Sequence, residues 1–156
     1  MYKKIMVPLD GSGLAECVLP HVEGFINQCQ VSQIVFVRVL ESITPAIAGE
    51  YAISMDDLQN RESARKAEAE AYLKQVIDRF QPATTDLQTE VLFGRPADRL
   101  AEYAENNDID LILMATHGRS GVSRWVRGSV ADRILRAASV PVLMVRAPGT
   151  ATEKPA

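Results

Sequence analysis

Short apolar segments alternate with longer amphipathic ones along this chain, and that alternation limits its fold more than any other feature. The apolar segments, typical of strands, are residues 4–9, 33–40, 87–93, 109–115 and 141–146. The segments with helical spacing are residues 13–29, 55–80, 96–107 and 129–138. Strands that alternate with helices of this length indicate βαβ units. The sequence therefore predicts an α/β fold with one open parallel sheet and helices on both of its faces.

Details of the helical segments lead to more specific expectations. Pro20 lies inside the first segment, where it removes a helix hydrogen bond, so that helix is expected to be kinked or to begin late. The charged residues of 61–70 are expected to form a solvated face with pairs such as Glu62–Lys66. The last helix is expected to place four apolar residues on one side: Val130, Ile134, Leu135 and Ala138.

Length and cysteine content bound the class of protein. The 156 residues are enough for one domain with its own core. We expect that domain to cover residues 1–147, and the Pro/Ala/Thr-rich tail at 148–156 to be disordered. Two cysteines, Cys17 and Cys29, are too few for a disulfide framework or a metal site. Because no segment has the length and apolarity of a membrane span or signal peptide, a cytoplasmic location is expected.

Charge is distributed unevenly along the chain. The 17 basic and 20 acidic residues give a net charge of −3, which does not favour nucleic-acid binding. In contrast, residues 119–136 hold five arginines and one acid, Asp132, so their local charge is +4. This reversal favours an anionic ligand, and the alternative interpretation is a solvated basic surface.

A parallel sheet binds its ligands beyond the carboxyl ends of its strands, where the strand order reverses. The segments expected there are residues 10–13, those after Val39, 94–95 and 116–128. Apart from the long charged helix, these are the parts of the chain richest in Gly, Ser and charged residues. Their composition favours a binding function over a purely structural one.

The loop at 116–128 has features suited to phosphate binding. Gly118, Gly121 and Gly128 let backbone N–H groups approach an anion with no Cβ in the way. Gly128 and Ser129 open the last helix, whose free N–H groups and positive dipole end attract phosphate. Ser129 followed by Asp132 also resembles a capping box, so Ser129 could serve only to cap that helix.

Two familiar nucleotide motifs are absent, and the case for catalysis is weak. Gly11-x-Gly13 is followed by Glu16 where a dinucleotide fingerprint has its third glycine, and no Gly-x4-Gly-Lys-Ser/Thr occurs. His117 could act as a base, but one histidine without an aligned acid is weak evidence. Asp10 could bind ribose hydroxyls, hold a divalent cation, or cap the turn that follows it.

The sequence resembles the universal stress protein family over about residues 2–147. The matching segments are residues 4–12, 37–39, 94–96, 110–121, 128–130 and 141–145. The ATP-binding branch of the family has Gly-x2-Gly-x9-Gly-Ser/Thr, and here Gly118, nine residues and Gly128-Ser129 match it. Ala115 stands in place of the first glycine, and its methyl group is expected to leave less room for a nucleotide to approach the backbone there.

The resemblance implies a five-stranded sheet in the order 3-2-1-4-5, with a nucleotide at the carboxyl ends of its strands. Adenine is expected near Pro8, Val39 and Met114, with Asp10 near adenine or ribose. The ribose and α-phosphate are expected above Ala115, His117, Gly118 and Arg119. The helix start at 128–130 would hold the β- and γ-phosphates. The full set of expected nucleotide-binding residues is Pro8, Leu9, Asp10, Val39, Met114, Ala115, His117, Gly118, Arg119, Gly121, Gly128, Ser129 and Val130.

The function implied by the resemblance is regulatory binding of an adenine nucleotide, ATP or AMP. Mg²⁺ or Mn²⁺ would accompany a triphosphate, with Asp10 near the phosphate-bound cation. Because no strong general base or charge clamp is evident, no catalytic residue is assigned and any ATP hydrolysis is expected to be slow. The alternatives are an adenylyl- or phosphoryl-transferring enzyme using His117 and Asp10, a cyclic-nucleotide binder, and an interaction module without nucleotide. Segment 41–53 is expected to be either a lid over the site or a mobile loop without a specific role.

The family also forms homodimers through the last strand, and this sequence supports that independently. In the implied strand order, residues 141–145 form an edge, and PVLMV carries no charge that would prevent edge-to-edge pairing. The expected partners are therefore a second copy and an unidentified protein, with neither nucleic acid nor membrane insertion. The expected dimer interface is Pro141, Val142, Leu143, Met144 and Val145.

Overall fold

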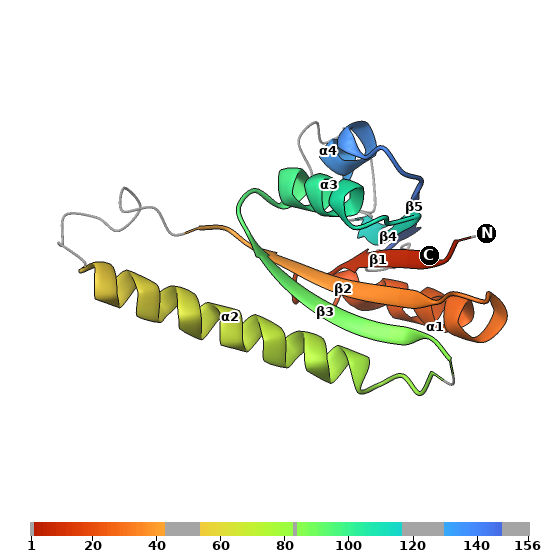
Figure 1. Ribbon diagram of the computed structural model, residues 1–156, viewed down its shortest axis with the longest axis horizontal. Helices are drawn as coiled ribbons and strands as arrows, with labels where there is room; N and C mark the ends of the chain where they lie inside the picture. The colour runs from red at the N-terminus through yellow and green to blue at the C-terminus, as the bar shows by residue number, and fades with distance from the viewer. Residues whose placement is uncertain (1, 43–53, 83, 117–129, 148–156) are drawn as a thin grey trace, which may run out of the picture.

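A single parallel sheet forms the centre of the molecule (Figure 1). The computed structural model describes residues 2–42, 54–82, 84–116 and 130–147. The strands run β1 Lys4–Pro8, β2 Gln33–Leu40, β3 Asp86–Phe93, β4 Leu111–Thr116 and β5 Val142–Arg146. All neighbouring strands pair in parallel, in the order β3-β2-β1-β4-β5. The predicted fold class and strand order are therefore confirmed.

Helices cover both faces of the sheet, as predicted (Figure 1). One face carries the short 3₁₀ helix η1 Ala15–Val18, α1 Leu19–Gln28 and α2 Met55–Ile77. The other carries α3 Pro96–Asn106 and α4 Val130–Ala137, which pack against each other. No helix in the described ranges has the length and apolarity needed to cross a membrane.

Pro20 determines where the first α-helix begins. The chain after β1 first forms η1, and α1 starts at Leu19 with Pro20 in its first turn. A proline in that turn costs no hydrogen bond, because the first N–H groups of a helix have no partner within it. Of the two predicted outcomes, the late start is therefore the observed one.

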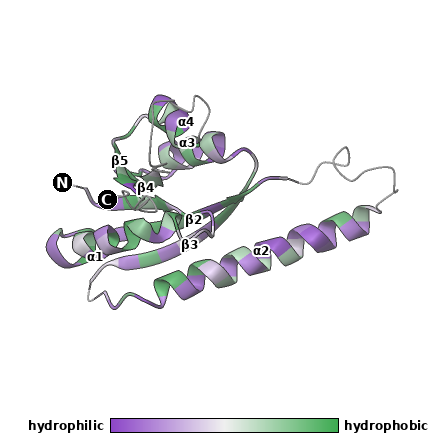
Figure 2. Cartoon of the chain, turned by 180° about the vertical axis from the view of Figure 1, so that it is seen from behind, coloured by the Kyte–Doolittle hydropathy of each residue, from purple (hydrophilic) through white to green (hydrophobic). Residues whose placement is uncertain are grey.

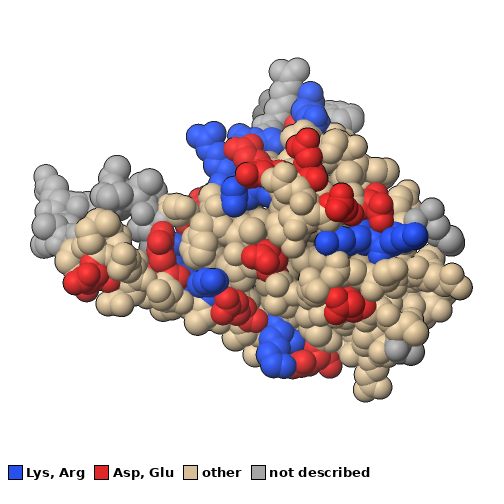
Figure 3. Space-filling view, viewed as in Figure 1, with Lys and Arg blue, Asp and Glu red and all other residues tan. Residues whose placement is uncertain are grey.

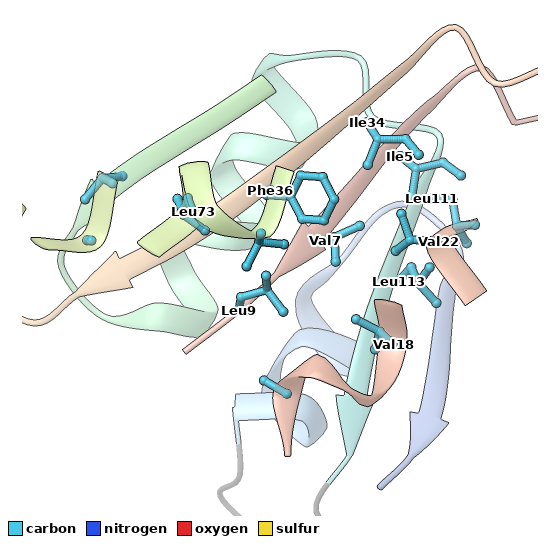
Figure 4. Packing of buried hydrophobic residues seen from close by; sticks show 14 of the residues in the cluster. Ile5, Val7, Leu9, Val18, Val22, Ile34, Phe36, Leu73, Leu111 and Leu113 are labelled. Atoms are coloured by element: carbon cyan, nitrogen blue, oxygen red, sulfur yellow. The ribbon is translucent and has the colours of Figure 1, made fainter. Parts of the chain in front are cut away.

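The core on the α1/α2 face is built by alternate residues of the central strands. Ile5, Val7, Ile34 and Phe36 point into it and are fully buried, together with Leu73 of α2 (Figure 4). Phe36 also stacks on Phe80, with 5.7 Å between ring centroids. Successive strand residues point to opposite faces, so the residues between them face α3 and α4.

The second core lies under α3 and α4 and is centred on Met6, Val35 and Ile112. In α4 only Ile134 is fully buried, whereas Val130 is 40% exposed and Leu135 is 56% exposed. The apolar side expected for this helix is therefore buried at Ile134 and largely exposed at Val130 and Leu135. Leu135 follows Ile134 and points about 100° away from it around the helix, which takes it off the sheet.

The helix α2 is long, polar and only partly supported by the sheet. Its buried residues, Ala69, Leu73 and Val76, all lie in its C-terminal half, while its N-terminal half extends beyond the sheet (Figure 1). Figure 2 shows hydrophobic residues concentrated in the strands and long hydrophilic stretches along this helix. The solvated face is confirmed, but the expected Glu62–Lys66 pair does not form in the described part of the chain, where Lys66 pairs with Glu70 at 3.7 Å instead.

Asp110 ties the start of β1 to the start of β4. Its carboxylate accepts hydrogen bonds of 2.8 Å from the backbone N–H groups of Lys3 and Lys4. Its own N–H donates to the Lys4 carbonyl at 2.9 Å. The hydrogen bonds from Lys4 and Lys3 hold the pKa of Asp110 below its ordinary value, because they stabilise the ionised carboxylate.

Asp110→Asn should therefore destabilise the protein in a pH-dependent way. A carboxyl group with a lowered folded-state pKa stabilises the fold above its unfolded pKa of about 3.9 and loses that effect as pH falls through the folded pKa. We expect Asp110→Asn to lower the free energy of unfolding by about 1 kcal/mol at pH 7. This is at the low end for hydrogen bonds to a charged group, because the Asp110 side chain is exposed. Urea unfolding of both proteins from pH 7 to pH 3 should show that the difference in their free energies of unfolding disappears below about pH 4. A difference that stays constant over this range would contradict the role given to the ionised Asp110.

Candidate functional site

The carboxyl ends of β1 and β4 meet where the strand order reverses, which is where this sheet type binds ligands. Met6 pairs with Ile112 across these strands. Pro8 and Met114 each lie two residues further along, so they occupy the same level and the same face of the sheet. Val39 lies on that face too, two residues beyond Val37, the β2 partner of Pro8.

These three residues form an apolar surface on the α3/α4 side. Pro8 and Val39 are half-buried, and Met114 is 6% exposed. Val39 and Met114 belong to the second core. Leu9 and Ala115, also predicted to bind nucleotide, lie on the opposite side, where Leu9 is buried in the core on the α1/α2 face and Ala115 packs against that core. The structure thus brings three of these five apolar residues together and separates the other two.

Asp10 follows this surface and is exposed to solvent. Its Oδ1 accepts a hydrogen bond of 2.8 Å from the N–H of Ser12, so it does cap the turn that follows β1. The Ser12 hydroxyl in turn accepts a hydrogen bond of 3.2 Å from the N–H of Ala15, the first residue of η1. No hydrogen bond to Asp10 Oδ2 occurs within the described ranges, so that oxygen can accept one from a ribose hydroxyl or bind a cation.

The backbone of Gly11 lies against the guanidinium group of Arg38. Gly11 has a φ of +87°, a conformation that favours glycine, and a Cβ added there would lie 3.1 Å from an Arg38 nitrogen. Arg38 itself lies over the ring of Tyr72, with 5.3 Å between Cζ and the ring centroid. Sequence reasoning assigned no role to Arg38, although a charge inside the apolar strand 33–40 was a usable signal.

A second group of polar contacts continues from Tyr72. Its hydroxyl donates to Glu16 Oε1 at 3.1 Å, and Arg79 donates to Glu16 Oε2 at 2.6 Å. Burial raises the pKa of Tyr72 above its ordinary value, and the nearby Glu16 carboxylate raises it further. The phenol therefore remains protonated and keeps its hydrogen bond to Glu16.

Several predicted site residues lie outside the described ranges: His117, Gly118, Arg119, Gly121, Gly128 and Ser129. The expected disordered tail at 148–156 lies outside them as well, and so do residues 43–53 of segment 41–53, which was expected to be a lid or a mobile loop. Val130 is the first residue of α4. Among the arginines of the basic segment, Arg136 pairs with Asp132 at 3.3 Å, while Arg133 is exposed. Figure 3 shows acidic and basic side chains interspersed over the visible face.

The described ranges contain no cluster of three or more His, Cys, Asp or Glu residues that could hold a metal ion. Cys17 and Cys29 are free, half-buried thiols, and burial raises the pKa of Cys17.

The edge strand β5 pairs with β4 through Met114–Met144 and neighbouring positions. Pro141 is exposed, as is Leu143 at 42%, while Val142, Met144 and Val145 are half-buried. The edge is therefore apolar and accessible in the single chain.

Comparison with known proteins places the chain in one family. The model of the universal stress protein family matches residues 1–146. The universal stress protein MJ0531 of Methanocaldococcus jannaschii is 32% identical over 150 residues, which cover 95% of this chain and 84% of the relative.

Solved structures agree with this result at the level of the fold. The structure of protein MJ0577 from the same organism has a TM-score of 0.77 at 23% identity and covers 96% of this chain and 99% of its own. A universal stress protein crystallised in complex with cAMP has a TM-score of 0.67 at 20% identity, with 94% and 98% covered. With a family match over nearly its whole length and the strand order observed here, this chain belongs to the universal stress protein family.

Proposed function

We propose that this protein is a stress-response regulatory protein that binds an adenine nucleotide, ATP above all, at the carboxyl ends of β1 and β4. The observation that carries the proposal is the apolar surface of Pro8, Val39 and Met114, with Asp10 directly beside it. It lies at the switch point of a parallel sheet, where this class of fold binds ligands. A family member in complex with cAMP supports an adenine-containing ligand.

The apolar surface suits a flat, weakly polar base. Adenine would gain from leaving water there, and Met114 offers a polarisable thioether for contact with an aromatic ring. Asp10 Oδ2 would accept hydrogen bonds from ribose hydroxyls while Oδ1 stays bonded to Ser12. Base and sugar would thus be recognised by different groups at one end of the sheet.

The phosphates would lie at the start of α4. Gly118, Gly121 and Gly128 would allow backbone N–H groups to approach the anion, and Ser129 and Val130 would add the N–H groups of the helix start. Mg²⁺ or Mn²⁺ would neutralise a triphosphate, with Asp10 near its ligand shell. AMP or a cyclic nucleotide would use the same base and sugar contacts with fewer phosphate contacts.

Regulation by nucleotide state is favoured over catalysis. The site residues proposed above bind and orient, and none of those described pairs a base with an aligned acid. ATP hydrolysis would therefore be slow. Metal-dependent turnover well above background that is lost in His117→Ala would favour an adenylyl- or phosphoryl-transferring enzyme instead.

Gly128→Leu should weaken ATP binding by about tenfold or more, because a leucine side chain would occupy the space that the phosphates need. Titration calorimetry with ATP, AMP and cAMP measures this and ranks the three ligands. Gly24→Leu is the matched control, since Gly24 lies in α1 with no atom within 4 Å of an added Cβ. Equal ATP affinity in the Gly128 variant and the wild type would overturn the phosphate assignment.

We also propose a homodimer that forms through the edge strand β5, at Pro141, Val142, Leu143, Met144 and Val145. The accessible apolar edge supports this, because such an edge can pair with a second copy.

Leu143→Glu should convert this dimer to a monomer, because it places a charge on the pairing edge. Light scattering at micromolar concentration should give about twice the chain mass of 17.1 kDa for the wild type and that mass for the variant. Thr89→Glu changes an exposed residue on the opposite edge strand, β3, and should leave the dimer intact. A monomeric wild type would contradict the proposal.

A further inference from the structure

We infer that Arg38 and Tyr72 are positioning residues, which hold the loop carrying Asp10 in the conformation that the nucleotide site needs. This inference rests on the proposed function, because it assigns the nucleotide contact to Asp10. According to this inference, α2 helps to set the geometry of the nucleotide site. It does so although α2 packs on one face of the sheet and the apolar surface of Pro8, Val39 and Met114 lies on the opposite face.

The guanidinium group of Arg38 packs against Gly11, the residue that follows Asp10. The guanidinium nitrogens and Cζ of Arg38 lie 3.1–3.3 Å from the position of a Gly11 Cβ. A planar group therefore packs directly on the backbone that follows Asp10. Gly11 has a positive φ, and a shift of its backbone would change the orientation of the peptide groups on either side of it. The Arg38 side chain limits such a shift from the α2 side.

Arg38 is itself held by its contact with Tyr72. Its guanidinium lies over the Tyr72 ring, and within the described ranges no carbonyl or carboxylate accepts a hydrogen bond from it. The ring face is thus its only specific contact there besides Gly11. A flat guanidinium stacks on a ring in a defined plane, whereas a lysine ammonium does not.

Tyr72 is held in turn by a hydrogen bond to Glu16. The residue lies in α2, and its hydroxyl donates to Glu16 of η1, which also pairs with Arg79 just beyond α2. Glu16 is tied to the same loop from the other end, because η1 begins three residues after Ser12. The loop from Asp10 to η1 is therefore held at both ends by side chains that converge on Tyr72.

The consequence concerns the carboxylate of Asp10. Ser12 N–H donates to Asp10 Oδ1 across Gly11, so a change in the Gly11 backbone alters this hydrogen bond and the direction of Oδ2. The Ser12 amide is therefore a local reporter of loop geometry. It reports in the nucleotide-free protein, independently of whether a nucleotide binds.

The experiment compares four variants by ¹⁵N NMR without nucleotide and by titration calorimetry with ATP. Arg38→Lys and Tyr72→Leu should each shift the Ser12 amide signal, speed its hydrogen exchange and weaken ATP binding by about tenfold. Tyr72→Phe keeps the ring under Arg38 but loses the hydrogen bond to Glu16, so it should shift the signal and weaken ATP binding less than Tyr72→Leu does. Lys74→Ala removes an exposed ion pair with Asp78 in the same helix and should leave the Ser12 signal and the ATP affinity unchanged.

The outcomes separate this inference from the proposed function. An unchanged Ser12 signal in Arg38→Lys and Tyr72→Leu would overturn it, whatever the nucleotide result. A shifted signal with unchanged ATP affinity would overturn the link to the nucleotide. Equal losses in Lys74→Ala would show a general effect of α2 and would also overturn it. Absence of ATP binding by the wild type would contradict the proposed function, while the amide signals would still test the loop contacts.

Discussion

Burial of β1 on both faces is the constraint on which the rest of the structure depends. Ile5, Met6 and Val7 are fully buried at consecutive positions, so helices must cover both sides of this strand. Its neighbours, β2 and β4, are reached by crossovers on opposite faces, and the strand order reverses beside it. The same arrangement places Pro8 and Asp10 at the carboxyl end of β1, beside the point where the strand order reverses and where this type of sheet binds ligands.

Most of the fold could be predicted from the sequence because it depends on local patterns. Continuous apolar runs such as 33–40 indicate strands buried on both sides, and β2 has these bounds in the structure. Pro20 indicated a disturbance in the first helix, since its ring and missing N–H act at that residue. The strand order, in contrast, came from resemblance to a family, because pairing between distant strands leaves little trace in local sequence.

The features that escaped prediction depend on tertiary packing. The contact of Arg38 with Gly11 and Tyr72 joins three segments far apart in the chain, and only the sheet register brings them together. Leu135 is apolar by composition yet exposed, because its position around α4 turns it away from the sheet. The side chains of Leu9 and Met114 lie on opposite faces of the sheet, because side chains alternate along a strand, and this follows only once the register is known.

The proposed nucleotide site lies at the carboxyl ends of β1 and β4, over Pro8, Val39 and Met114. The most direct test follows the backbone amide signals of the protein while ATP is added. We expect the largest shifts at Asp10, Val39 and Met114. Shifts confined to the groove between α2 and β3, whose lining includes Lys74 and Leu87, would contradict this proposal.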